Sequence, residues 1–329
     1  MTDTKFDVLA VGNAIVDVLA ESSDAFLEEQ SLVKGAMRLI DENEADTLYA
    51  AMGPGVEVSG GSAANTAAGV AALGGRGAFV GRVHDDSLGK VFAHDIRAQG
   101  VSFESETATS GPQTARCLVL VTPDAQRTLN TYLGACVGLR EADIDPAGVA
   151  ASKVVYLEGY LWDAPEGPAI FASAAEAAKQ AGREVAMTLS DPFCVDRHRA
   201  AFRDFVAGSV DILFANEDEI KSLYEVEAFD EAADRAVVDV TVAALTRSEK
   251  GSVICRGAER HAVDARSVKV VDTTGAGDLY AAGFLYGYTA GEDLARAGTY
   301  GSICAGEVIS HLGARPRANL KSLIAEQLG

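Results

Sequence analysis

Residues 271–278, with the sequence VDTTGAGD, have the types and spacing best suited to chemistry. Two glycines flank an alanine, Asp278 follows at once, and the apolar spacing beyond it becomes helical. Such a segment can expose several backbone N–H groups at a helix start, where anions such as phosphate bind. Asp278 would repel a phosphate unless it accepted the proton of an attacking hydroxyl. The segment therefore predicts phosphoryl transfer to a hydroxyl, with simple helix capping as the alternative.

A second glycine-rich segment covers residues 59–68, SGGSAANTAA. Its paired glycines, Gly60 and Gly61, would let a ligand approach the backbone closely at a helix start. Asn65 lies one turn further on, where its amide could bond a substrate hydroxyl. The alternative is a glycine turn that leads into a helix packed through small residues.

A third polar segment, residues 12–17 (GNAIVD), follows the apolar run Phe6–Val11. Asp17 is expected just past the carboxyl end of that strand, where ligands bind open α/β sheets. A carboxylate that accepts two hydrogen bonds suits a vicinal diol, as on a ribose. A solvent-facing turn aspartate is the alternative.

Two later segments could contact a nucleotide. Asn216 and Glu219 follow the predicted strand 211–215 and lie three apart, so they share one helix face. Hard oxygen ligands there can hold Mg²⁺, usually through water, although a helix cap explains the pair equally well. Residues 246–251 (TRSEKG) could present hydroxyl and N–H groups to a nucleotide or form a plain hairpin loop. The chain has neither a P-loop motif nor a dinucleotide fingerprint.

These segments require a scaffold in which strands and helices alternate. Strands are expected at 6–11, 78–83, 116–121, 127–133, 153–159, 184–190, 210–215, 241–246, 252–256 and 260–263, and helices at 42–51, 62–73, 88–99, 166–181, 216–224, 229–237, 276–289, 292–309 and 317–327. The alternation predicts an α/β fold with a mainly parallel central sheet and helices on both faces. The β-rich segments at about 14–40 and 103–133 break this rhythm, and we expect them to form a small β-sheet lid within a single domain, 1–329.

Composition excludes several classes of protein. The chain has 329 residues, 48% of them hydrophobic, and a formal net charge of -20. So acidic a chain repels nucleic acid and anionic membranes, and no apolar run reaches membrane-spanning length. The five scattered cysteines form no C-x-x-C pair, which indicates reduced thiols without a zinc site. We therefore expect a cytoplasmic protein with a small-molecule ligand, and local basic residues if that ligand is ATP.

Together the motifs closely resemble the ribokinase-like (PfkB) carbohydrate kinase family. The early G-G-x-x-x-N, the N-x-x-E and the late D-T-x-G-A-G-D occur in family order, and the match runs from about Val8 to Pro316. The resemblance implies ATP-dependent phosphorylation of a sugar or nucleoside hydroxyl. The site residues that it implies are Asp278 as general base, Gly275, Ala276 and Gly277 as the anion hole, Asn216 and Glu219 for Mg²⁺ through water, and Thr246, Ser248, Gly251 and Thr274 along the nucleotide.

The resemblance also implies a monovalent cation site, for an ion such as K⁺, beside the anion hole. The residues of this chain that match it are Asp272, Thr274 and the turn His311-Leu312-Gly313.

Within the family, residues 12–17 look like the adenosine kinase version. Ribokinases typically begin with G-S-x-N-x-D and have a lysine where this chain has Ser62. Residues 127–135 (RTLNTYLGA) resemble the adenosine kinase lid strand, in which an arginine at the position of Arg127 reaches the transferring phosphates. This branch of the family implies transfer from ATP to the 5′-hydroxyl of adenosine. The acceptor contacts that it implies are Asn13, Asp17, Gly60, Gly61, Asn65, Leu129, Thr131 and Tyr160.

Two regions leave the acceptor open. Residues 160–162 and 191–193, where a base pocket could form, are less like well-known adenosine kinases. One alternative is a kinase of the same family that acts on ribose, fructose or a related sugar. The other is a non-catalytic nucleoside or sugar sensor. Whichever function holds, we expect a monomer or a homodimer.

Overall fold

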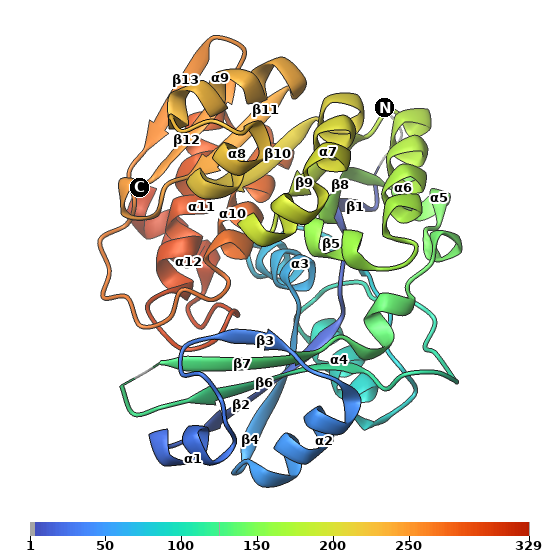
Figure 1. Cartoon of the computed structure of the whole chain (residues 1–329). Helices are drawn as coiled ribbons and strands as arrows, with labels where there is room; N and C mark the ends of the chain where they lie inside the picture. The colour runs from blue at the N-terminus through green and yellow to red at the C-terminus, as the bar shows by residue number, and fades with distance from the viewer. Residues whose placement is uncertain (1–3, 125, 329) are drawn as a thin grey trace.

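The computed structural model describes residues 4–124 and 126–328, and a large twisted sheet dominates it (Figure 1). The strand order is β13-β12-β11-β10-β9-β8-β1-β5. The strands from β11 to β5 run parallel, and β12 and β13 are antiparallel additions at one edge. Their bounds are β1 Phe6–Val11, β5 Gly77–Val80, β8 Ser152–Glu158, β9 Glu184–Thr188, β10 Ile212–Asn216, β11 Val242–Thr246, β12 Ser252–Arg256 and β13 Glu259–Val263.

Helices cover both faces of this sheet, as predicted, because its strands are apolar on both sides. Along β1, Val8 and Ala10 face one buried cluster while Leu9 and Val11 face the other. The first cluster includes residues of α3 (Ser62–Ala72), α4 (Ser87–Ala98), α10 (Ala276–Thr289), α11 (Leu294–Val308) and α12 (Leu320–Leu328). The second includes residues of α5 (Pro146–Ala150), α6 (Gly167–Ala181), α7 (Pro192–Ser209), α8 (Glu217–Tyr224) and α9 (Phe229–Asp239).

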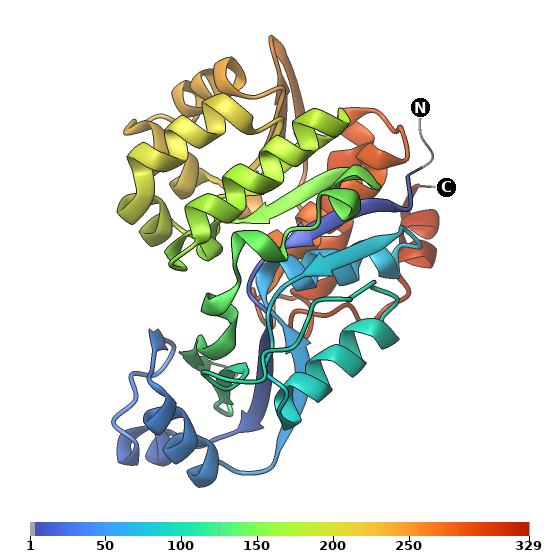
Figure 2. The ribbon, with the colours of Figure 1, turned by 90° about the vertical axis from the view of Figure 1, so that its right-hand side faces the viewer.

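A separate small sheet stands beside the main domain, with strand order β3-β7-β6-β2-β4 (Figures 1 and 2). Its strands are β2 Ile15–Glu21, β3 Met37–Leu39, β4 Gly55–Gly60, β6 Ala115–Val121 and β7 Arg127–Tyr132. Helices α1 (Asp24–Glu29) and α2 (Glu42–Ala51) lie on the side away from the main domain (Figure 1). That this small sheet acts as a lid over the site stays a prediction.

Several details of the structure differ from the sequence prediction. β4 belongs to the small sheet but lies outside 14–40 and 103–133; its terminal glycines resemble turns, and only pairing with β2 makes it a strand. Asp17, expected just past the carboxyl end of the strand Phe6–Val11, lies in β2, which begins four residues after β1 ends. The long helix α7 was not predicted, because charged residues interrupt its apolar positions.

The remaining short elements are 3₁₀ turns at Gly134–Gly138, Glu141–Asp143, Gly159–Asp163 and Ser248–Lys250. No helix in residues 4–124 and 126–328 combines the length and apolarity that crossing a bilayer requires.

Candidate active site

Asp278 lies in the first turn of α10, and two side chains from α3 hold its carboxylate. Ser62 Oγ donates to Oδ1 at 2.6 Å, and Asn65 Nδ2 donates to Oδ2 at 2.8 Å. Ser62 and Asn65 are three residues apart and so share one helix face. Thr66 Oγ1 also donates to the main-chain carbonyl of Asp278 at 3.2 Å. The packing of α3 against α10 thus brings the two glycine-rich segments together and fixes the predicted base.

The environment of Asp278 suits proton transfer. Burial raises the pKa of its carboxyl above the ordinary value, while hydrogen bonds from Ser62 and Asn65 and the positive charge of Arg315 lower it. A base with a raised pKa binds a proton more readily near neutral pH. Within the described chain Asn65 Oδ1 is buried without a hydrogen-bond partner, so a hydroxyl placed beside the base could donate to it.

The helix start beside Asp278 has the geometry of an anion site. Gly275 precedes α10 with φ 78°, and a Cβ there would lie 2.8 Å from Ala314 Cβ, so only glycine fits. A Cβ on Gly277 would meet nothing within 4 Å, which leaves that face open to a ligand. Ala276 N donates to Thr273 O at 3.2 Å. Among the described residues, Gly277 N and Asp278 N donate to no carbonyl outside the helix, so these first-turn N–H groups are available to a phosphate.

The structure also brings together the predicted acceptor segments. A Cβ on Gly60 would lie 2.4 Å from Asp17 Oδ2, and a Cβ on Gly61, where φ is 96°, would lie 2.1 Å from Asn13 O. The backbone of Asn13 and the positive φ therefore require glycine at position 61, whereas a Cβ at position 60 would displace the Asp17 carboxylate. Asn13 itself is buried and donates through Nδ2 to Glu158 Oε1 at 2.9 Å.

The Asp17 carboxylate is half-buried and makes no hydrogen bond to any residue that the structure describes. Burial raises its pKa to about 6, against the lowering effect of Arg315 and Arg127; Asp278 and Asp272 raise it further. A carboxylate in this state is free to accept hydrogen bonds from a ligand, and it does so best above that pKa.

A pocket lies between the small sheet and the main domain. Asp17, Asn65, Arg127 and Leu129 are among the predicted residues that line it. Its other lining residues are Leu19, Val58, Ser59, Val119, Thr274, Gly313, Ala314 and Arg315. The lining combines apolar side chains from the small sheet with the predicted charged groups of Asp17 and Arg127 and the unpredicted one of Arg315.

Five predicted acceptor residues lie outside this lining: Asn13, Gly60, Gly61, Thr131 and Tyr160. Thr131 is buried on β7, where its hydroxyl bonds Cys117 Sγ at 3.3 Å. Tyr160 follows β8; its N–H donates to Ser190 Oγ at 3.1 Å and its hydroxyl to Ser190 O at 3.3 Å. Any contact between Tyr160 and an acceptor stays a prediction.

Arg127 reaches from β7 to the anion-hole segment. Its Nη1 lies 2.7 Å from Thr274 Oγ1 and 2.8 Å from Asp272 Oδ2. The exposed fractions of the Arg127 and Asp272 side chains are only 8% and 3%, so the ion pair is shielded from water. The small sheet is thereby tied to the segment that would bind the phosphate.

Asp272 also organises the turn proposed for a monovalent cation. Its Oδ1 accepts from Thr274 N at 3.0 Å and its Oδ2 from Gly313 N at 2.8 Å. The His311 ring instead pairs with Glu307, with Nε2 3.1 Å from Oε1. Because Arg127 already supplies a positive charge at Asp272, a K⁺ site here stays a prediction.

The predicted magnesium pair forms a helix cap. Asn216 Oδ1 accepts from Glu219 N at 2.9 Å, while the Glu219 carboxylate accepts from Asn216 N at 2.9 Å and from Asn216 Nδ2 at 2.6 Å. Burial raises the pKa of Glu219 to about 7. No group of three or more acidic, histidine or cysteine side chains in the described residues is arranged to hold a metal. These residues therefore fit Mg²⁺ only through intervening water.

The predicted nucleotide loop lies next to that cap. Asn216 pairs in register with Thr246, so the two segments lie side by side at the end of the parallel strands. Ser248 and Gly251 have φ of 51° and 81°. A Cβ on Gly251 would lie 2.0 Å from Val263 O, so the tight turn into β12 requires glycine.

Three residues at the site were not predicted. Ser62 could have been found from its position three residues before Asn65 at a helix start. Glu158, whose Oε2 accepts from Ala63 N at 2.8 Å, carries the signal of an acid at the carboxyl end of an apolar strand; burial raises its pKa to about 7. Arg315 belongs to no recognisable local pattern.

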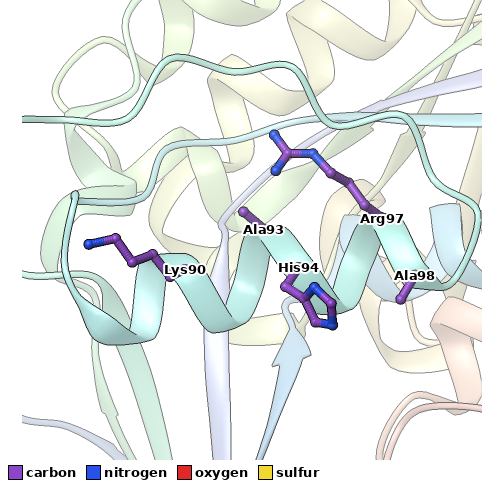
Figure 3. Close-up of a pocket in the computed structure, with 5 residues that line it drawn as sticks. All are labelled: Lys90, Ala93, His94, Arg97 and Ala98. Atoms are coloured by element: carbon purple, nitrogen blue, oxygen red, sulfur yellow. The ribbon is translucent and has the colours of Figure 1, made fainter.

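A second concave surface, along α4, has different chemistry. It is lined by Lys90, Ala93, His94, Arg97 and Ala98 and contains no carboxylate (Figure 3). Lys90 pairs with Asp85 at 3.2 Å, and Arg97 donates through Nε and Nη2 to Phe103 O at 2.9 and 2.7 Å. This surface therefore lacks a carboxylate base, and its lysine and arginine are already engaged.

The family of the chain follows from comparison with known proteins. A model of the pfkB family of carbohydrate kinases matches residues 36–320. The chain belongs to this family. As a pfkB-family kinase it has the ribokinase-like fold and is a phosphotransferase that acts on a hydroxyl group.

The relatives of this pfkB-family kinase have different named acceptors. An adenosine kinase structure from Sinorhizobium meliloti is 53% identical, with TM-score 0.91 and coverage of 99% of this chain and 100% of that one. The structure of a probable sugar kinase from Rhizobium etli is 51% identical, with TM-score 0.92 and coverage of 98% and 99%. An ATP-dependent ribose-1-phosphate kinase from Halopiger xanaduensis is 29% identical over 258 residues, 78% of this chain and 82% of that protein.

Proposed function

We propose that this kinase transfers the γ-phosphoryl group of ATP to the 5′-hydroxyl of adenosine, giving AMP and ADP. The observation that carries the proposal is the position of the Asp278 carboxylate. Ser62 and Asn65 hold it at the start of α10, beside the open face of Gly277 and near the free carboxylate of Asp17. One end of this arrangement suits a phosphate, and the other suits a ribose diol.

In this mechanism Asp278 accepts the proton of the 5′-hydroxyl as that oxygen bonds to the γ-phosphorus. The bond between this phosphorus and the oxygen of the leaving ADP breaks, and the proton stays on Asp278. The N–H groups at the start of α10 stabilise the charge on the transferring group, as does Arg127 once it leaves Asp272. Asn216 and Glu219 would hold Mg²⁺ through water, and this ion would neutralise phosphate charge.

Three observations support adenosine as the acceptor. The pocket side chains Leu19, Val58, Val119 and Leu129 are apolar, which suits a flat base better than a free sugar. Arg127, which the resemblance matches to the adenosine kinase lid arginine, contacts the anion-hole segment. The 53% identical structure from Sinorhizobium meliloti is an adenosine kinase.

A sugar acceptor is the second candidate. Asp17 and Asn65 would bond the hydroxyls of a free sugar as readily as those of a ribose on a base. The similar protein from Rhizobium etli is a probable sugar kinase, which favours this alternative. A non-catalytic sensor is disfavoured, because binding alone would not need an acid at a phosphate site.

Product analysis with a matched acceptor tests the proposal. The protein is incubated with ATP, Mg²⁺ and either adenosine or 5′-deoxyadenosine, and the nucleotides are separated. We expect AMP and ADP in equal amounts from adenosine and no acceptor-dependent ADP from 5′-deoxyadenosine. ADP formation without AMP would overturn the proposal.

The five cysteines are consistent with a reducing, cytoplasmic compartment, which we propose for this enzyme. All five are buried and unpaired. Thiols in such positions keep the reduced state that the cytoplasm maintains.

A further inference from the structure

The guanidinium of Arg315 binds the backbone on both sides of the paired glycines. Nε and Nη2 donate to Ser59 O at 3.1 and 2.9 Å, and Nη2 also bonds Ser59 Oγ at 3.0 Å. Nη1 donates to Ala64 O at 2.8 Å. One side chain therefore fixes both ends of residues 59–64, which we call the acceptor loop. This loop carries Ser62 and leads directly to Asn65.

The two residues before Arg315 contact the anion hole. Gly313 N donates to Asp272 Oδ2 at 2.8 Å. Ala314 packs so closely under Gly275 that a Cβ there would lie 2.8 Å from Ala314 Cβ. Residues 313–315 thus connect the segment that would bind the phosphate with the loop that would bind the acceptor.

The charge of Arg315 acts on the pocket through space. In the described chain its hydrogen bonds go to carbonyl and hydroxyl oxygens, not to a carboxylate. The nearby acids are Asp95, Asp17 and Asp278. Asp95 is already engaged by Ser59, whose N and Oγ lie 2.8 and 2.7 Å from its Oδ2.

Burial lowers the pKa of Arg315 to about 10, so it remains protonated at neutral pH. Its positive charge lowers the pKa of Asp17 and of Asp278. The other charged groups that face Asp17 are Arg127, Asp272 and Asp278. The titratable groups that face Asp278 besides Arg315 are Asp17, Glu158, Tyr156 and Tyr160, and Ser62 and Asn65 are its hydrogen-bond donors.

We propose that Arg315 is a positioning residue of phosphoryl transfer, which locks the acceptor loop to the anion hole and supplies positive charge to Asp17 and Asp278. This role rests on the proposed function, in which those two carboxylates bind and deprotonate the acceptor. Its two parts are separable. The planar fork of arginine makes the loop contacts, whereas a lysine would keep the charge and lose most of them.

The test compares R315M, R315K and the matched control R256M, which removes an exposed arginine from β12. Two quantities are measured: kcat/KM for adenosine as a function of pH, and hydrogen exchange of the amides in residues 59–65. R315M should lower kcat/KM on the order of 10-fold and move its acidic limb up by about one pH unit, because both carboxylates lose a positive neighbour. Its acceptor-loop amides should exchange faster. R256M should match the wild type.

R315K separates the effect of the positive charge from that of the hydrogen bonds to the acceptor loop. It also replaces R315M in the test if R315M does not fold. We expect the acidic limb to return close to its wild-type position while the acceptor loop still exchanges fast. If the wild type is active but R315M changes neither the pH profile nor the amide exchange, the role of Arg315 is overturned and the proposed function stands. Where R315M does not fold, unchanged amide exchange in R315K overturns the role in the same way. A wild type without acceptor phosphorylation overturns the proposed function and this role with it.

Discussion

The Ser62 hydroxyl donates a 2.6 Å hydrogen bond to Oδ1 of Asp278, a residue 216 positions later in the chain. This bond stabilises the ionised carboxylate and lowers the pKa of Asp278, in opposition to burial, which raises it. The pKa of Asp278 is therefore set by two opposing effects, burial and hydrogen bonding.

S62A should shift the pH dependence of turnover. Without the hydroxyl donor the pKa of Asp278 rises, so a smaller fraction is ionised at a given acidic pH. The acidic limb of kcat should move to higher pH by about one unit, the equivalent of one hydrogen bond to a charged group. S322A, which alters an exposed serine of α12, should leave the profile unchanged. Equal profiles for S62A and the wild type would show that Ser62 does not tune the base.

D278N should keep acceptor affinity and lose most turnover. The amide accepts no proton, and a general base contributes about 10²–10⁴-fold. Asn65 can turn its amide to bond the new side chain, because its Oδ1 has no partner among the described residues. Calorimetric titration with adenosine and steady-state kinetics check the two halves of the prediction, with exposed D204N as control. Half of the wild-type kcat in D278N would remove Asp278 from proton transfer.

D17A should raise KM for adenosine roughly 10–150-fold and change KM for ATP little. A charged hydrogen-bond partner of a diol contributes on the order of 1.5–3 kcal/mol. Because burial raises the pKa of Asp17 to about 6, wild-type acceptor affinity should fall as the pH decreases through that value, and D17A should lose this dependence. Steady-state kinetics with adenosine and 2′-deoxyadenosine test it. The assignment fails if both acceptors react equally well and D17A alters neither.

R127A should lower kcat far more than it raises KM for either substrate. In the structure Arg127 is held by Asp272 and Thr274, so its contact with a phosphate must form later, as charge develops in the transition state. R127K should recover only part of the activity, because a point charge lacks the planar fork. R38A removes another arginine of the small sheet, outside the pocket, and serves as control. Wild-type turnover by R127A at saturating substrates would assign the role to another cation.

The sequence predicted the architecture because its signals are local. An apolar run such as Phe6–Val11 predicts a strand from a few neighbouring residues, and the glycines around Asp278 predict a helix start in the same way. The unpredicted helix α7 also had local signals, Asp191 as N-cap and Pro192 in the first turn. Its charged first half hid the apolar positions that face the core.

The site was predictable only in part, because its remaining contacts join distant residues. Glu158 and Arg315 are placed by bonds to Ala63 and Ser59, at separations of 95 and 256 residues. Likewise Arg127 was expected to face a phosphate, whereas its ion pair with Asp272 depends on how β7 crosses the anion-hole segment. Such pairings come from tertiary packing and leave no pattern in the neighbouring sequence.

The most direct test of the account is acceptor competition. Wild-type protein receives ATP, Mg²⁺ and an equimolar mixture of adenosine, ribose, ribose 1-phosphate and fructose, and the initial rates of phosphorylated products are measured in the same reaction. The account predicts that AMP forms faster than any phosphorylated sugar and that D278N lowers the rates of all products together, by about 10²–10⁴-fold. A sugar that is phosphorylated faster than adenosine would contradict the central claim.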